Sequence, residues 1–67
     1  MKIILNNNPE TIDIDRISIT ELLARKNYSF KMLIIKINGN LVKKDEYETS
    51  FISDGDDVMV LHLISGG

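Results

Sequence analysis

One stretch in the first half of the chain carries a nearly complete signal for the start of a single helix. Ser18 is a good N-cap residue, and Glu21, three residues later, completes a capping box. Ile17 and Leu22 occupy the two positions of a hydrophobic staple across that cap. Asn27 can end the helix in a left-handed conformation. A helix of about ten residues is marginal alone, so this one must pack against a sheet formed by the rest of the chain.

The first fifteen residues predict a β-hairpin. Residues 1–5 place alternate apolar side chains on one face of a strand. Residues 11–15 alternate apolar and acidic side chains, which is typical of a second strand with one buried face. Because Pro9 lacks a backbone N–H and asparagine tolerates tight turns, we expect residues 6–9 to separate the two strands.

Three further strands are expected after the helix, in residues 32–37, 41–44 and 58–63. The Asn-Gly pair at Asn38 and the Asp-Gly pair at Asp54 predict the tight turns that precede the second and third of them. We expect residues 45–50 to form a helical turn or a loop, and Phe51 and Ile52 to return to the core.

The expected order, β-β-α-β-β-β, predicts an α+β protein with a β-grasp fold, in which a mixed sheet packs on one helix. The first and last strands would pair as central neighbours, because a right-handed crossover through the helix permits this. The folded domain would span residues 1–63, and residues 64–67 would form a flexible Gly-Gly tail.

Composition excludes several classes of protein. The chain has 67 residues and no cysteine, so it can form neither disulfides nor a thiolate zinc site. A net charge of −2 argues against nucleic acid as the main partner. No apolar run approaches the length that spans a membrane, and the first residues are too short for a signal peptide. We therefore expect a soluble, cytoplasmic protein without a membrane partner.

The sequence also lacks a catalytic set. It contains no P-loop, no Gly-x-Ser-x-Gly motif and no nucleophilic cysteine. His62 is the single histidine, and a lone histidine in a strand is more often structural than a general base or metal ligand. The acidic run from Asp54 to Asp57 does not have the ligand spacing of a calcium loop. We expect a non-catalytic protein that binds no metal.

The last residues suggest a chemical role for the chain terminus. A terminal carboxylate, here that of Gly67, becomes an acyl donor only after adenylation by ATP supplies a good leaving group. The terminus would then thread into the active site of a partner enzyme, with Ser65 and Gly66 in the channel. Glycine allows the close backbone approach that a narrow channel demands. A carrier activated by another protein would therefore end in this way.

The whole chain resembles the ThiS family, the sulfur carriers of thiamine thiazole biosynthesis, within the ubiquitin-like β-grasp group. The matching stretches are residues 37–42 (Ile-Asn-Gly-Asn-Leu-Val), residues 54–58 (Asp-Gly-Asp-Asp-Val), the Met-Lys-Ile opening and the terminal Gly-Gly. The resemblance implies that a ThiF-type enzyme uses ATP to adenylate the Gly67 carboxylate, which then receives sulfur as a thiocarboxylate. A desulfurase system would provide the sulfur, and a ThiG-type thiazole synthase would accept it. No permanently bound cofactor is implied.

We expect partners to bind the exposed face of the sheet near the tail. If Val58 and Val60 point inward, period two turns the residues between and after them outward. The apolar side chains expected on this face are Met32, Ile34, Met59, Leu61 and Leu63. The opposite register would bury them instead. The nearby acids, Asp54, Asp56 and Asp57, would steer a basic groove of the partner toward this face.

Three alternatives stay open at this point. The small subunit of molybdopterin synthase is another β-grasp carrier with a Gly-Gly end, but those chains are usually longer. Another ubiquitin-like sulfur carrier, such as one that serves transfer-RNA modification, or a ubiquitin-like modifier is a further alternative. A TGS-like β-grasp binding module shares the Asn-Gly and Asp-Gly-Asp patterns, although such modules are normally embedded in longer proteins.

Overall fold

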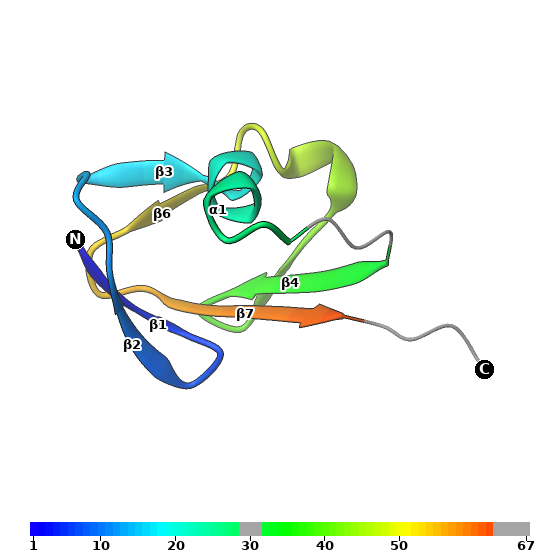
Figure 1. Ribbon diagram of the computed structural model, residues 1–67. Helices are drawn as coiled ribbons and strands as arrows, with labels where there is room; N and C mark the ends of the chain where they lie inside the picture. The colour runs from blue at the N-terminus through cyan, green and yellow to red at the C-terminus, as the bar shows by residue number, and fades with distance from the viewer. Residues whose placement is uncertain (29–31, 63–67) are drawn as a thin grey trace.

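A computed structural model of the chain describes residues 1–28 and 32–62. One mixed sheet has the strand order β2-β1-β7-β4-β5. Its strands are β1 (Lys2–Leu5), β2 (Asn8–Thr11), β4 (Leu33–Ile37), β5 (Asn40–Val42) and β7 (Asp57–His62). The helix α1 (Ile19–Arg25) and a second, two-stranded sheet of β3 (Arg16–Ser18) and β6 (Phe51–Ser53) lie on the same side of it (Figure 1). A short 3-10 helix, η1 (Lys44–Glu46), follows β5.

The first and last strands of the described chain pair in parallel at the centre of the large sheet. Ile4 lies opposite Asp57, and Leu5 lies opposite Val58. On its other side β7 pairs antiparallel with β4 from Leu33 to Ile37. The predicted β-grasp fold, with these two strands as central neighbours, is confirmed.

The core lies between the large sheet and the layer formed by α1 and the β3–β6 pair. Each layer contributes aliphatic side chains that are buried almost completely, so the short helix is stabilised by packing and not by its length. The buried apolar residues are Ile3, Leu5, Ile12, Ile17, Ile19, Leu22, Ile35, Val42, Ile52, Val58 and Val60.

The helix begins at the predicted N-cap, but only half of the predicted capping box forms in the described structure. The Glu21 carboxylate accepts from the Ser18 hydroxyl at 3.3 Å and not from the Ser18 backbone N–H. The Ser18 hydroxyl oxygen accepts a hydrogen bond from the backbone N–H of Glu21 at 3.1 Å, and the side chains of Ile17 and Leu22 are both fully buried. Asn27 follows the helix with a φ of 56°, the left-handed conformation expected of it. The helix is seven residues long, which is shorter than the predicted ten.

The predicted N-terminal β-hairpin forms, but its second strand begins earlier in the sequence than predicted. Asn6 and Asn7 have φ angles of 51° and 66° and form a two-residue turn, so β2 already begins at Asn8. The predicted strand at residues 11–15 is therefore wrong beyond Thr11. Pro9 does not break the strand, because it lies opposite Ile4 on the outermost strand of the sheet, where proline is tolerated.

The residues after β2 also differ from the prediction. The N-terminal ammonium donates hydrogen bonds to the carbonyl oxygens of Ile12 and Ile14, at 2.6 and 3.2 Å, so their alternating pattern belongs to a loop that covers the chain start.

Ile52 is buried as expected, but the prediction that Phe51 returns to the core is wrong. Phe51 is 43% exposed, and the Arg16 guanidinium lies 4.3 Å from the centre of its ring.

Both predicted glycine turns are present. Asn38 and Gly39 have φ angles of 51° and 84° and connect β4 to β5 as a two-residue turn. Gly55, with a φ of 86°, forms the turn between β6 and β7. Residues 45–50, predicted as a helical turn or loop, contain the end of η1 and the turn after it. Across the described residues, no helix is both long and apolar enough to cross a bilayer.

Candidate functional site

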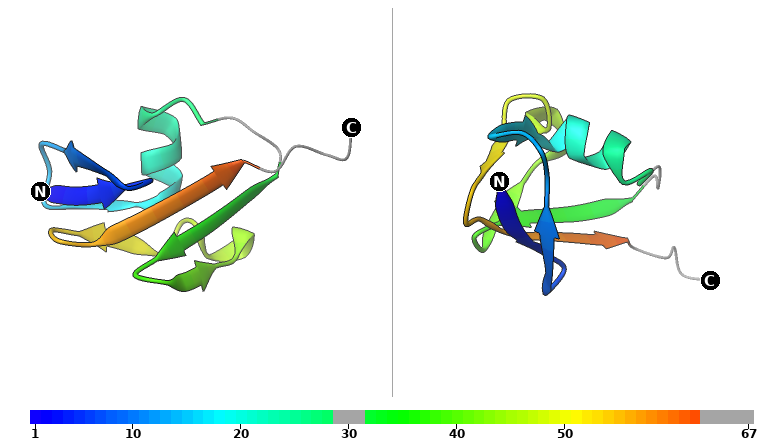
Figure 2. Two further views of the ribbon diagram at one scale, coloured as in Figure 1. Left: turned by 90° about the horizontal axis from the view of Figure 1, so that it is seen from below. Right: turned by 60° about the vertical axis from the view of Figure 1, so that its left-hand side comes forward.

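The face of the large sheet opposite α1 is the first part of the candidate site. None of the described helices or strands covers this face, as the left view of Figure 2, seen from below, shows for β7 and β4. On β7, Val58 and Val60 are buried, while Met59 is half-buried and Leu61 is 45% exposed. The predicted register of this strand is therefore confirmed.

The neighbouring strand continues the same surface. Ile34 lies directly opposite Leu61, and Lys36 lies opposite Met59, so the four side chains share one face. Met32 lies just before β4 and is 51% exposed. Of the five side chains expected on the partner-binding face, Ile34, Met59 and Leu61 thus lie on the neighbouring strands β4 and β7. Met32 lies next to the start of β4, and Leu63 lies outside the described residues.

The sequence argument missed two apolar members of this face, one on β5 and one on β1. Leu41, on β5, lies opposite Lys36 and is 61% exposed. Ile4, on β1, is exposed between the buried Ile3 and Leu5. The same period-two count that placed Leu61 outward, applied to the first and fourth strands, would have identified them. We define the outer patch as six of the residues that face away from α1 on the large sheet: Ile4, Ile34, Lys36, Leu41, Met59 and Leu61.

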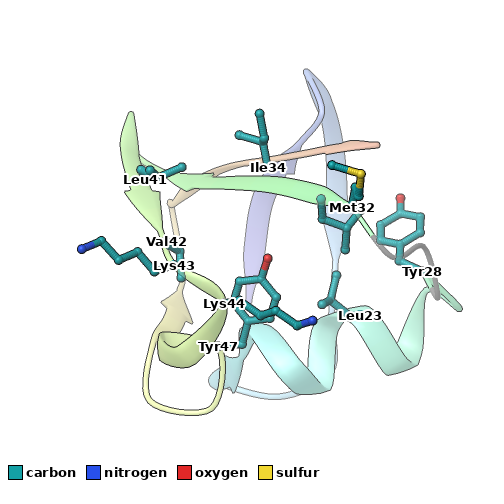
Figure 3. Close-up of a pocket in the computed structure, with 10 residues that line it drawn as sticks. Leu23, Tyr28, Met32, Ile34, Leu41, Val42, Lys43, Lys44 and Tyr47 are labelled. Carbon is teal, nitrogen blue, oxygen red and sulfur yellow. The ribbon is translucent and has the colours of Figure 1, made fainter. Parts of the chain in front are cut away.

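A hollow adjoins the outer patch where β5 leaves β4. Its cavity volume is about 720 Å³. The last residue of β5, Val42, pairs with Ile35 in β4. The first two residues of β4, Leu33 and Ile34, therefore have no partner in β5, and the hollow opens beside them. In Figure 3, Ile34 and Leu41 lie on one side of these strands, and Leu23 and Tyr47 lie on the side of the helix. The hollow therefore joins the exposed face of the sheet to the gap beside α1.

The walls of the hollow are mostly apolar, with a basic rim. One part of its wall comes from the helix side and from the start of β4: Leu23, Tyr28, Leu33 and Tyr47. The remaining apolar wall comes from the edge formed by β4 and β5. Lys43 and Lys44 lie at the mouth, directly after β5. This part of the surface combines aliphatic, aromatic and cationic side chains.

The second part of the candidate site is the chain end. β7 is the central strand of the sheet and is described as far as His62, which lies opposite Leu33. Three residues named above for carboxyl-terminal chemistry, Ser65, Gly66 and Gly67, lie outside the described residues, as does the predicted domain boundary at residue 63. The outer patch thus lies on the strand that leads directly to them.

The acidic residues before β7 have structural partners. The Asp54 carboxylate accepts a hydrogen bond from the backbone N–H of Lys2 at 2.6 Å. The Asp56 carboxylate accepts from the backbone N–H of Ser53 at 2.9 Å and from the Asn38 side chain at 3.0 Å. Because they precede β7, these two acids lie beyond the opposite end of that strand from His62. The strand itself, from Asp57 to His62, is about 16 Å long at 3.3 Å per residue.

Nothing in the described part of the chain resembles a metal site, since no group of three or more metal-ligating side chains occurs there. His62 is exposed on β7. The arrangement is suited to binding another protein through the outer patch and to positioning the chain end that follows β7.

Comparisons with known proteins agree with this arrangement. A protein-family model described as the ThiS family matches residues 3–67. A crystal structure of the thiamine biosynthesis protein ThiS from Geobacter metallireducens is 26% identical, with a TM-score of 0.89 and complete coverage of both chains. An NMR structure of a thiamine biosynthesis protein from the same organism is also 26% identical; its TM-score is 0.80, with 100% of this chain and 88% of that chain covered. The search of curated proteins gave no match.

Proposed function

The chain belongs to the ThiS family, and we propose that it is a cytoplasmic sulfur carrier for thiamine biosynthesis that works through its terminal carboxylate. The observation that carries the proposal is the family match, which extends through the last residue, Gly67. The chain would be the substrate of its partner enzymes and not itself a catalyst. It would need no resident cofactor, because ATP would be consumed by the activating enzyme.

Activation would proceed in two steps on Gly67. In the first, a carboxylate oxygen attacks ATP within a ThiF-type enzyme, pyrophosphate leaves, and an acyl adenylate forms. In the second, sulfide-level sulfur supplied by a desulfurase system attacks the acyl carbon as hydrosulfide, displaces AMP and loses its proton. The product is a thiocarboxylate, which a ThiG-type thiazole synthase would accept as its sulfur source. Small residues at Ser65 and Gly66 would let the chain enter the narrow site.

The outer patch would dock the carrier on these partners. An apolar surface of neighbouring exposed residues on a small protein typically marks an interaction site. Met59 in the patch, and Met32 in the wall of the adjoining hollow, supply flexible side chains that adapt to more than one partner. Of the two patch residues on β7, Met59 and Leu61, Leu61 is nearer to the chain end. Docking at Leu61 would therefore direct the terminus toward the partner's active site. Leu63 would continue this contact.

The test is intact mass spectrometry after incubation with ATP, a sulfide source and a ThiF-type enzyme. We expect the C-terminal peptide to gain the mass difference between sulfur and oxygen. A chain that lacks Gly67 should keep its circular dichroism spectrum and gain no mass.

Two other outcomes would count against the proposal. If the activating enzyme modifies a known carrier but not this chain, the chain serves another sulfur pathway or is a binding module. If the chain without Gly67 is still adenylated, the terminal carboxylate of that residue is not the reacting group.

A further inference from the structure

Two turns that are distant in the sequence are joined by the side chain of Asn38. Its Nδ2 donates a hydrogen bond to the Asp56 carboxylate at 3.0 Å, and its Oδ1 accepts one from the backbone N–H of Asp57 at 2.9 Å. The backbone N–H of Asn38 also donates to the carbonyl oxygen of Asp57 at 2.7 Å. We call these three hydrogen bonds the turn clasp. They hold the β4–β5 turn against the first residue of β7.

The sequence makes this same side chain chemically labile. Asn38 is the only asparagine in the chain that is followed by glycine. Glycine has no side chain to shield its backbone nitrogen, so that nitrogen can approach the amide carbon of the preceding asparagine. The space beside Gly39 is open as well, since nothing lies within 4 Å of the position that a Cβ atom would take there. The exposed flank of Gly39 is therefore free of neighbouring side chains in the described structure.

We propose that Asn38 is a latent deamidation site that the turn clasp keeps intact. The Gly39 nitrogen attacks Cγ of Asn38, loses its proton to solvent, and forms a new N–C bond. The bond from Cγ to Nδ2 breaks, and the nitrogen leaves as ammonia after taking up a proton. Water then opens the five-membered succinimide and gives either aspartate or isoaspartate at this position, with no oxidation or reduction.

The clasp protects the amide because both ends of the side chain are held in hydrogen bonds to another turn. Cγ of Asn38 can reach the Gly39 nitrogen only after the amide leaves Asp56 and Asp57. The native reaction rate is then the rate of the open chain multiplied by the fraction of molecules in which the clasp is open. Asp56 thus acts as a positioning residue for the stability of the amide bond.

The product cannot restore the clasp. A carboxylate at residue 38 has no N–H to donate, and it would face the Asp56 carboxylate at hydrogen-bond distance, where like charges repel. The isoaspartate product also adds a carbon to the main chain of a two-residue turn, which disturbs the pairing of Ile37 with Asn40. One opening event followed by reaction therefore leaves a permanently weakened junction between β4, β5 and β7.

The first experiment measures deamidation of the full chain by peptide mapping with mass spectrometry at mildly alkaline pH. In denaturant, the peptide that contains Asn38 should deamidate, and in buffer its rate should fall by at least about tenfold, as expected for a clasp that is closed most of the time. Equal rates in the two solvents would overturn the protective role of the clasp. An intact Asn38 in denaturant would overturn its lability.

The matched variants are Asp56→Ala and Asp54→Ala. Both remove one carboxylate of the same turn. Asp54→Ala loses the hydrogen bond from the Lys2 N–H, and Asp56→Ala loses those from the Ser53 N–H and from Asn38, so only Asp56 contacts Asn38. Asp56→Ala should deamidate at Asn38 several times faster than Asp54→Ala at temperatures where urea titration shows both to be folded. Equal rates would mean that general loosening of the turn, and not the Asn38 contact, controls the reaction.

A second comparison does not depend on the reaction rate. Asn38→Asp reproduces one product. Asn40→Asp introduces the same charge on the other side of Gly39, at an exposed residue whose side chain forms no hydrogen bond within residues 1–28 and 32–62. Asn38→Asp should lower the melting temperature by several degrees more than Asn40→Asp, as expected when a paired donor is lost. Equal melting temperatures would show that the product leaves the junction unharmed.

Discussion

The Oδ1 atom of Asn6 accepts a hydrogen bond from the backbone N–H of Val60 at 2.8 Å, across 54 residues of sequence. The parallel pairing of β1 with β7 joins Ile4 to Asp57 and Leu5 to Val58, so the Asn6 side chain continues the contact beyond the end of β1. It reaches the strand at the position just before Leu61, which belongs to the outer patch. The turn of the first hairpin therefore helps to hold the strand that leads to the chain end.

Replacement of Asn6 by alanine should lower the free energy of unfolding by about 2–5 kcal/mol. About 1–3 kcal/mol comes from leaving the N–H of Val60 without its partner. A further 1–2 kcal/mol, about the cost of a left-handed residue with a Cβ atom, comes from the positive φ of Asn6. Urea denaturation followed by circular dichroism measures the sum.

Asn7→Ala is the matched control for this prediction. Asn7 also has a positive φ, but it has no side-chain hydrogen bond in the described structure, so its replacement should cost only the conformational part. The difference between the two variants estimates the contribution of the Asn6–Val60 hydrogen bond. Identical losses of stability would show that the bond contributes nothing.

The helix cap gives a second prediction. Ser18→Ala removes the hydroxyl oxygen that accepts from the N–H of Glu21 and should destabilise the protein by about 1 kcal/mol. Thr20→Ala, at an exposed position in the first turn, should cost less than about 0.5 kcal/mol. The measurement is urea unfolding of both variants, and the urea concentrations at their midpoints are compared. A larger loss for Thr20→Ala would contradict the assigned capping role.

A third prediction concerns docking. Leu61→Asp should weaken binding to a ThiF-type enzyme by at least tenfold, because about 1.4 kcal/mol or more is typical for loss of a central apolar contact. Leu61 is exposed, so the variant should unfold at nearly the wild-type urea concentration. Calorimetric titration measures the binding.

The neighbouring residue supplies the contrast for that experiment. Val60 points to the opposite side of the same strand and is buried, so Val60→Asp should unfold the domain. If Leu61→Asp is the variant that unfolds, the exposed face has been assigned incorrectly. If it folds and binds normally, the outer patch is not the docking surface.

A fourth prediction concerns the ion pair between Lys26 and Glu10, whose charged atoms are 3.2 Å apart. It connects the end of α1 to the edge strand β2. Because both side chains are about one-third exposed, Lys26→Met should cost at most about 1 kcal/mol, and 1 M salt should remove most of that difference. Exchange of the two charges, Glu10→Lys with Lys26→Glu, should recover part of the loss. A loss that does not depend on salt would indicate packing by the lysine stem instead.

The elements that could be predicted from the sequence are those encoded by neighbouring residues. The N-cap of Ser18, the turn at Asn38 and Gly39, and the alternation along β7 each depend on only a few adjacent side chains. For this reason Leu61 could be placed outward before the fold was known. The Gly-Gly pattern suggested a role for the Gly67 carboxylate, and the family resemblance then added the sulfur chemistry proposed for it, which no local pattern supplies.

The parts that could not be predicted depend on contacts between distant residues. The alternation of Ile12 and Ile14 imitates a strand, but their carbonyl oxygens instead bind the chain's first ammonium group. The strands β3 and β6 are three residues each and exist only because they pair with one another. Their register places Ile52 opposite Ile17 in the core, and therefore turns Phe51 outward.

The central position of β7 has a mechanical consequence. A partner enzyme that holds the chain beyond His62 and pulls on it applies force along β7, roughly parallel to the strand. β7 is bonded on one side to β1 and on the other to β4, so this load acts in shear on both rows of hydrogen bonds at once. Rows loaded in shear must break together, whereas an edge strand peeled from its end loses one bond at a time. The fold can therefore deliver its terminus under tension without unravelling from that end.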